Sequence, residues 1–239
     1  MKLKTILASS LLATSFTTTS VLALPTLGDI FDPSPFDSPF HDAIAADDAQ
    51  AFQLTDRSGI SGDATAFLFM EFAGYHSTNT FGLYDYTIAP DGTVTVTDTL
   101  QVFNGADGGM GNTFDSTVIS FDFGTGIATN LWTTATAMID DTFGFYLGVP
   151  NESATWYTHT VLNSDAVDHV YSYDVRGTLS EVVLLGSDVV LAWEDLTGGG
   201  DKDYRDFVVG ISDVRPVPAP ATIALFGLGI LVFAARRKV

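Results

Sequence analysis

The chain has 239 residues, with 29 acidic residues, 10 basic residues and no cysteine. The absence of cysteine excludes disulfides, thiolate metal sites and cysteine nucleophiles. The acidic excess argues against binding to nucleic acid or to anionic membranes. All 29 acidic residues but only 5 basic ones lie between the two ends, so this part, of about 190 residues, has a net charge of −24 and is long enough for one hydrophobic core.

The first 23 residues have the pattern of a secretory signal peptide. Lys2 and Lys4 precede the short apolar run Ile6–Ala13, and the small or aliphatic residues that a signal peptidase requires end at Ala23. An uncleaved N-terminal anchor is the alternative, although polar residues 17–20 interrupt the apolar run early. We therefore expect export by the general secretion machinery and cleavage near Ala23.

Residues 24–50 are expected to form a linker. They contain Pro25, Pro33, Pro35 and Pro39 together with several aspartates, and they show little hydrophobic periodicity. This composition favours an extended or poorly ordered backbone.

Residues 51–214 predict one all-β domain, a β-sandwich or a jelly-roll-like fold. Runs rich in β-branched and aromatic residues alternate with turns of glycine, aspartate and asparagine, and aspartate outnumbers glutamate 25 to 4, as expected for many acidic turns. No convincing amphipathic helix interrupts this range. We expect about nine strands, which are Ala64–Phe72, Thr93–Phe103, Thr117–Phe123, Thr142–Val149, Trp156–Leu162, His169–Val175, Glu181–Leu185, Asp188–Trp193 and Phe207–Ile211.

An acidic cluster near the end of this domain is a candidate calcium site. It surrounds three consecutive glycines, Gly198–Gly200, and its members are Glu194, Asp195, Asp201, Asp203 and Asp206. Ca²⁺ binds six to eight oxygens, which carboxylates and the carbonyls of a glycine turn can supply. The spacing is not that of an EF-hand. The alternative is a tight hairpin whose aspartates cap backbone N–H groups and pair with Lys202 and Arg205.

A second glycine-rich loop, Asn104–Asn112, is a weaker candidate for cation binding, with a plain flexible turn as the alternative.

Catalytic motifs are not recognisable in the chain. His41, His76, His159 and His169 are scattered, and His169 is expected to be a strand residue with a local hydrogen bond. Trp132 and Trp156 would stack on sugar rings if they were exposed, but core packing is the more common fate of tryptophan. We therefore expect a protein that is not an enzyme, with a secreted carbohydrate-active enzyme as an alternative.

The C-terminal segment, residues 215–239, has the pattern of a membrane-directed tail. The apolar run Ala221–Ala235 has 15 residues and is followed by Arg236, Arg237 and Lys238. A helix of this length reaches roughly 22 Å, less than the roughly 30 Å hydrocarbon core of a bilayer. The cations predict that the C-terminus stays in the cytoplasm. The segment is either a permanent single-pass anchor or a transient one that is cut.

This tail resembles a PEP-CTERM sorting signal. The resemblance rests on Val217, Pro218, Ala219, Pro220 and Ala221, then the short glycine-containing apolar run, then the basic cluster. Ala219 stands where the family usually has glutamate. The resemblance implies cleavage by exosortase, a membrane cysteine protease of Gram-negative bacteria that make exopolysaccharide.

The C-terminal half of the β domain has a resemblance of its own. Residues 141–214 are similar to a domain of unknown function common in exported bacterial proteins, whose hallmark is Phe-Glu-Asp-Leu, a glycine-rich turn and Asp-Arg-Asp-Tyr-Asn-Asp. Here the segment Trp193–Leu196 is followed by the glycines and then by Asp201–Asp206. The resemblance implies no particular reaction.

Together these features predict a calcium-stabilised, non-catalytic component of the cell surface, or of an exopolysaccharide or biofilm matrix, with matrix polysaccharide as a partner. A permanently anchored single-pass membrane protein is the other alternative.

Overall fold

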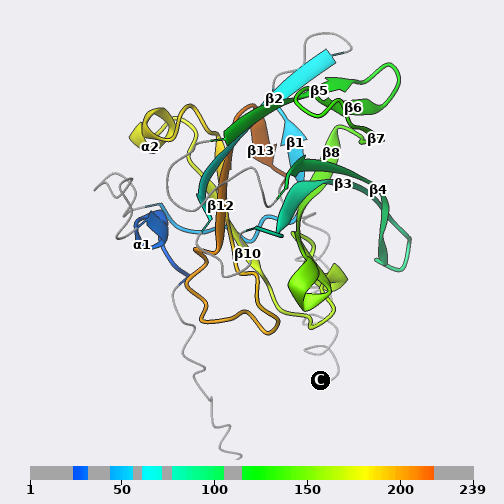
Figure 1. Ribbon diagram of the computed structural model, residues 1–239. Coiled ribbons are helices and arrows are strands. Elements are labelled where there is room, and N and C mark those ends of the chain that lie inside the picture. The colour runs from blue at the N-terminus through cyan, green and yellow to red at the C-terminus, as the bar shows by residue number, and fades with distance from the viewer. Residues whose placement is uncertain (1–23, 32–43, 56–60, 72–76, 105–114, 218–239) are drawn as a thin grey trace, which may run out of the picture.

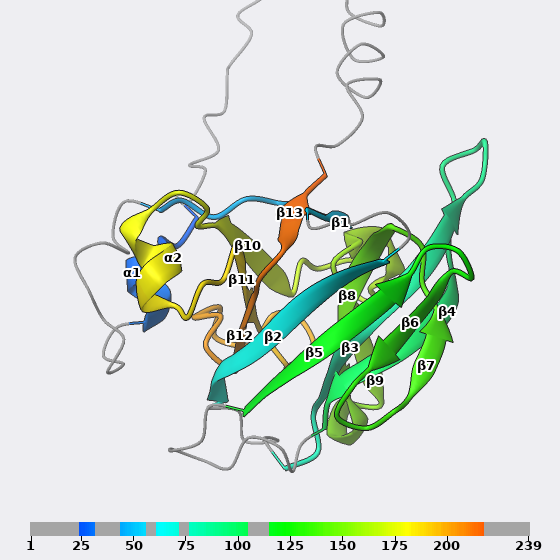
Figure 2. The ribbon, with the colours of Figure 1, turned by 90° about the horizontal axis from the view of Figure 1, so that it is seen from above.

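A computed structural model describes residues 24–31, 44–55, 61–71, 77–104 and 115–217. Two antiparallel sheets pack face to face, so the predicted all-β sandwich is confirmed (Figure 1, Figure 2). Among the described residues, no helix is both long and apolar enough to cross a membrane. The predicted signal peptide, the apolar run at 221–235 and most of the loop at 104–112 lie outside the described residues.

The first sheet contains both the first and the last strand of the domain. Its order is β13-β1-β8-β3-β4, and β9 pairs with β8 beyond the end of β1. The strands are β1 (Phe52–Leu54), β3 (Thr80–Ile88), β4 (Val94–Phe103), β8 (Thr142–Val149), β9 (Ala154–Tyr157) and β13 (Val214–Pro216).

The second sheet has seven strands in the order β10-β11-β12-β2-β5-β6-β7. Its strands are β2 (Ser61–Glu71), β5 (Asp115–Asp122), β6 (Ile127–Asn130), β7 (Thr136–Met138), β10 (Val170–Asp174), β11 (Val189–Trp193) and β12 (Phe207–Ile211).

The main core fills the space between the two sheets. The strand predicted for residues 93–103 is confirmed as β4, in which Leu100 and Val102 are buried whereas Thr99 and Gln101 are exposed. Phenylalanine rings dominate the core, and Phe81 contacts the rings of Phe103, Phe145, Trp193 and Phe207. Large aromatic side chains bury much apolar area each, which helps to stabilise a chain without disulfides.

A second, smaller core covers the outer face of β10, β11 and β12. It is completed by α1 (Leu27–Phe31), whose Leu27, Ile30 and Phe31 side chains are fully buried. The prediction that residues 24–50 form an extended linker is therefore wrong for residues 27–31. Three apolar residues within five positions are enough to dock one helical turn, although they are too few to reveal a helical period in a proline-rich sequence.

One predicted strand is also wrong. Residues 181–185 belong to the short helix α2 (Leu179–Val183) and the turn after it. Thr178 is the N-cap residue of α2, and the Glu181 carboxylate accepts the N–H of Gly177 at 2.6 Å. The spacing Thr-x-x-Glu from Thr178 to Glu181 is a signal for the start of a helix. The apolar residues that follow Glu181 suggested a strand instead.

The strand predicted for residues 156–162 is shorter than expected. It ends at Tyr157, and residues 160–162 form a 3₁₀ turn instead.

The two helices α1 and α2 lie on the same side of the molecule (Figure 1, Figure 2).

Candidate functional site

The acidic cluster occupies the loop that joins β11 to β12, residues 194–206 (orange in Figure 1). Gly198, Gly199 and Gly200 all have positive φ, and so do Lys202 and Tyr204, at +64° and +54°. Non-glycine residues rarely adopt this conformation. The backbone of this loop is therefore held in a specific shape, which the packing around it maintains.

Glu194 is one of two buried members of the cluster, with its neighbour Asp195. The Glu194 side chain is 0% exposed, and its Oε1 accepts the N–H of Tyr204 at 2.9 Å. Its Oε2 is buried and accepts no hydrogen bond from the described residues. Burial, with a further contribution from the charges of Asp206, Asp201 and Asp203, raises the pKa of Glu194 to about 8.

Two exposed carboxylates join Glu194 to form a compact group. Glu194, Asp201 and Asp203 each offer a carboxylate oxygen, and these oxygens all lie within 4.8 Å of one another. The Oδ1 of Asp203 also accepts the N–H of Arg205 at 3.0 Å, so the backbone capping considered from the sequence occurs as well. One side of this group is buried and the other faces solvent.

Asp195 and Asp206 form a separate pair. The Oδ2 of Asp206 accepts the N–H of Asp195 at 3.1 Å, and the Oδ2 of Asp195 accepts a hydrogen bond from Asn79 at 3.1 Å. Burial raises the pKa of Asp195, and burial together with the charge of Asp195 raises the pKa of Asp206 to about 7. The two carboxyls are thus held by hydrogen bonds within the protein.

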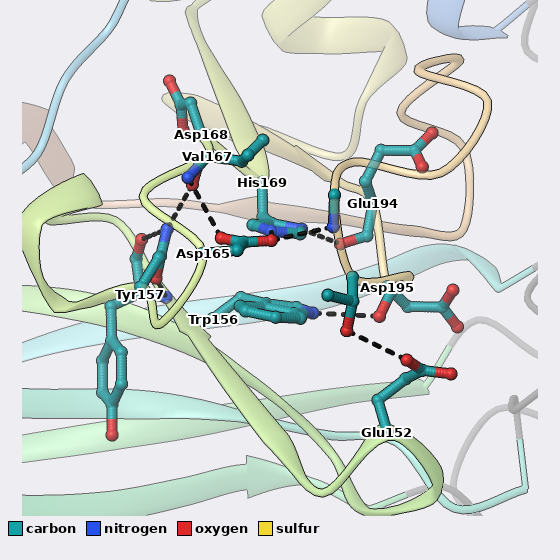
Figure 3. A network of polar contacts seen from close by, with 12 residues as sticks. Glu152, Trp156, Tyr157, Asp165, Val167, Asp168, His169, Glu194 and Asp195 are labelled. Atoms are coloured by element: carbon teal, nitrogen blue, oxygen red, sulfur yellow. Dashed lines mark hydrogen bonds and ion pairs between the residues drawn. The ribbon is translucent and has the colours of Figure 1, made fainter.

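A buried stack supports the start of the loop. The rings of Trp156 and His169 are parallel, with centroids 3.8 Å apart, and the Nε1 of Trp156 donates to the carbonyl oxygen of Asp195 at 2.9 Å. The His169 ring nitrogens lie 3.1 Å from the carbonyl oxygen of Glu194 and 3.0 Å from the Oδ2 of Asp165. Figure 3 shows the Glu194 carboxylate turned away from these rings. Both nitrogens of His169 are therefore engaged in positioning the loop.

The hairpin alternative pairs Arg205 with aspartates of the same loop, but its guanidinium binds another element. The Arg205 guanidinium donates to the carbonyl oxygen of Asp29 in α1, from Nε at 3.1 Å and also from Nη2. Arg205 thereby links the loop to the outer core.

The two tryptophans proposed as weak ligand contacts differ in position. Trp156 is fully buried in the stack, so it follows the core-packing alternative and is not exposed to stack on a sugar ring. Trp132 is 53% exposed and lies in the turn between β6 and β7. The buried Asn130 organises this turn, because its Oδ1 accepts the N–H of Trp132 at 3.0 Å and its Nδ2 donates to the carbonyl oxygens of Gln101 and Val102.

Sequence reasoning missed several residues that shape these sites. Asn79 lies 116 positions before Asp195, and nothing in the sequence links the two. Asn130 could have been suspected only from an asparagine that ends an apolar run before a turn.

The fold and the loop together define a class: an acidic two-sheet β protein with a carboxylate-rich loop at the end of one sheet. Residues 121–213 match a domain of unknown function, DUF4114, and residues 216–238 match the PEP-CTERM protein-sorting motif. Both resemblances seen in the sequence are confirmed. The match to DUF4114 begins at residue 121, which is 20 residues before the segment that suggested it. No curated protein and no solved structure has significant similarity to the chain.

The PEP-CTERM motif implies export and processing by exosortase at the membrane, so this is a surface or extracellular protein.

Proposed function

We propose that this protein is a non-catalytic structural or adhesive component of an extracellular polysaccharide matrix, released from its membrane tail by exosortase. The observation that carries the proposal is the position of the sorting motif. β13 ends at Pro216, which is also the first residue of the PEP-CTERM match, and Val217 still donates its N–H to Ala51 at 2.9 Å. All of the sandwich up to the last residue of β13 therefore precedes the processing signal, and it can be delivered as one folded unit.

The distribution of ionisable groups supports a role without catalysis. The carboxylates of Glu194, Asp201 and Asp203 are gathered within one loop, and Asp195 is bound to Asp206 and to Asn79. A hollow between the two sheets is lined only by apolar side chains, including Leu83, Phe145 and Ile211. A hydrolase would place two carboxylates across a groove that admits a sugar chain.

The delivery proposal is tested by mass spectrometry of the protein from the surface fraction of an exporting host with and without its exosortase. We expect the mature product to lack residues 1–23 with or without exosortase, and to lack Arg236–Lys238 only when exosortase is present. The double variant Pro218→Ala/Pro220→Ala should retain the tail, whereas Pro90→Ala, in an exposed turn, should be processed normally. A tail retained in the native protein despite active exosortase would favour permanent anchoring, and an intracellular product with both ends intact would refute the proposal.

Contact with polysaccharide is proposed for the exposed turn that carries Trp132. Its neighbour Leu131 is 55% exposed, and the buried Asn130 fixes the backbone of the turn, so the indole ring is presented to solvent by a rigid support. Indole rings stack on the apolar faces of sugars. The net charge of the exported part favours a neutral glycan over an anionic one.

Binding of the surface-released protein to neutral matrix polysaccharide should fall about tenfold in Trp132→Ala, as expected when one stacking contact of about 1.4 kcal/mol is lost. Leu131→Ala, which removes an apolar side chain from the same turn, should bind within about twofold of the native protein. Equal losses in both variants would contradict a stacking role. Appearance of new reducing ends during incubation with the polysaccharide would favour a carbohydrate-active enzyme.

A further inference from the structure

We propose that Glu194, Asp201 and Asp203 form a Ca²⁺ site that fixes the loop between β11 and β12. The three carboxylate oxygens, all within 4.8 Å of one another, converge on a position that one cation can contact. This inference goes beyond the proposed delivery to the surface and does not depend on it.

The unpartnered oxygen of Glu194 is the independent observation that points to a cation. Its other carboxylate oxygen accepts the N–H of Tyr204, but Oε2 is buried and receives no donor from the described residues. A buried, unpaired carboxylate oxygen is costly, and two further carboxylates beside it increase the cost through repulsion. A divalent cation would compensate both effects at once.

The backbone at Gly200 has the shape that such a site requires. A Cβ atom built at residue 200 would lie 2.2 Å from the Oε2 of Glu194, and the φ of Gly200 is +43°. Only glycine lets the main chain approach the unpartnered oxygen this closely. Carbonyls of the glycine turn and water would complete the coordination shell of a bound ion.

The donor set favours a hard cation. The three side chains offer oxygen only, the chain has no cysteine, and both ring nitrogens of the nearby His169 are engaged elsewhere. Zinc and copper prefer nitrogen and sulfur ligands, whereas calcium and magnesium prefer oxygen. Calcium tolerates an irregular shell of six to eight oxygens, and magnesium demands near-ideal octahedral geometry, so the irregular loop favours calcium.

The structure also divides the five acids that the sequence grouped together. Asp206 accepts the backbone N–H of Asp195, and the Asp195 carboxylate accepts a hydrogen bond from Asn79. The predicted ligand set therefore narrows to three side chains, one buried and two exposed. The exposed pair gives the ion a route from solvent.

The experiment is thermal unfolding of the full chain, purified in detergent and freed of metal with a chelator, in the presence and absence of 1 mM CaCl₂. Calcium that binds only the folded state raises the melting temperature, and a calcium concentration about tenfold above the dissociation constant corresponds to a rise of a few degrees for a domain of this size. Calorimetric titration of the native protein should give a dissociation constant below about 0.1 mM, within the range of known calcium sites.

Three variants separate a binding site from general charge reduction. Asp201→Asn/Asp203→Asn should lower the calcium affinity at least tenfold and abolish the rise, whereas Asp140→Asn/Asp141→Asn, which removes two charges from another loop, should respond like the native protein. Glu194→Gln should melt no lower than the native protein in chelator and gain nothing from calcium. No calcium-dependent rise in the native protein, or an equal rise in the Asp201/Asp203 variant, would overturn the site, and an equal response to magnesium would overturn its assignment to calcium.

Discussion

At the scale of single residues, the buried pair of Tyr84 and His159 makes the fold sensitive to acid. The Tyr84 hydroxyl lies 2.5 Å from the Nδ1 of His159 and also accepts the backbone N–H of His159 at 3.1 Å. The His159 ring contacts the ring of Tyr86 as well, and its side chain is almost completely buried. Burial lowers the pKa of His159 to about 4, because the charged imidazolium would lose its hydration.

We predict that this histidine reduces stability in mild acid. A histidine in the unfolded chain takes up a proton near pH 6.5, but the folded protein does not bind it until about pH 4. The unfolded state therefore binds more protons in this window, and the stability that is fully present above pH 6.5 is lost as the pH falls toward 4. Between pH 7.5 and 4.5 the loss should be about 2–3 kcal/mol.

Urea unfolding of the native protein and of His159→Phe at these two pH values would measure this contribution. The phenyl ring fills about the same volume as imidazole and leaves Tyr84 its hydrogen bond to the backbone. From pH 7.5 to pH 4.5 the free energy of unfolding of the variant should therefore rise by about 2–3 kcal/mol relative to that of the native protein. If the difference in unfolding free energy between the two proteins were the same at both pH values, His159 would not be the source of the acid sensitivity.

At the scale of elements, α1 helps to bury the outer face of β10, β11 and β12 in the seven-stranded sheet. All five residues of β11 and of β12 are buried, because the main core covers one face and the outer core covers the other. The N-terminal segment also protects the edge of this sheet, since Asp47 forms backbone hydrogen bonds with Ser172 on β10. Covering an edge strand in this way prevents pairing with other chains.

The importance of α1 can be tested with one truncated side chain. Phe31 is fully buried and contacts the Phe69 ring edge-on, so Phe31→Ala should destabilise the protein by about 3–5 kcal/mol in urea unfolding. Leu24→Ala, at a residue that is 44% exposed, should cost less than about 0.5 kcal/mol. A loss below about 1 kcal/mol for Phe31→Ala would mean that α1 does not dock on the sheet in solution.

The elements differ in how well they could be predicted from the sequence. β8 was predictable because apolar residues occupy every second position over the whole run, which is typical of a strand, and β4 has the same pattern except at Asp98. The helices were not, because five-residue elements are too short to show a period of 3.6 residues. The acidic loop was visible as glycines among aspartates, but its division into three and two acids depends on Asn79, which is far away in the chain.

At the scale of the whole molecule, the two halves of the chain are interleaved. The match to the domain of unknown function begins at residue 121, yet β2, from the earlier half, lies between β12 and β5 in the seven-stranded sheet. β3 and β1 likewise flank β8 in the other sheet. The matched region alone would have a gap in the middle of one sheet, so the earlier strands are an integral part of this fold.

The pairing of β1 with β13 has a consequence for the timing of folding during secretion. Phe52 lies opposite Pro216, although the whole domain separates them in sequence. A chain that emerges from a translocation channel with its N-terminus first leaves β1 without this partner until the domain has almost completely crossed. Such long-range contacts form slowly, so the last step of assembly should coincide with arrival of the sorting tail at the membrane, where the tether keeps the newly closed domain beside its protease.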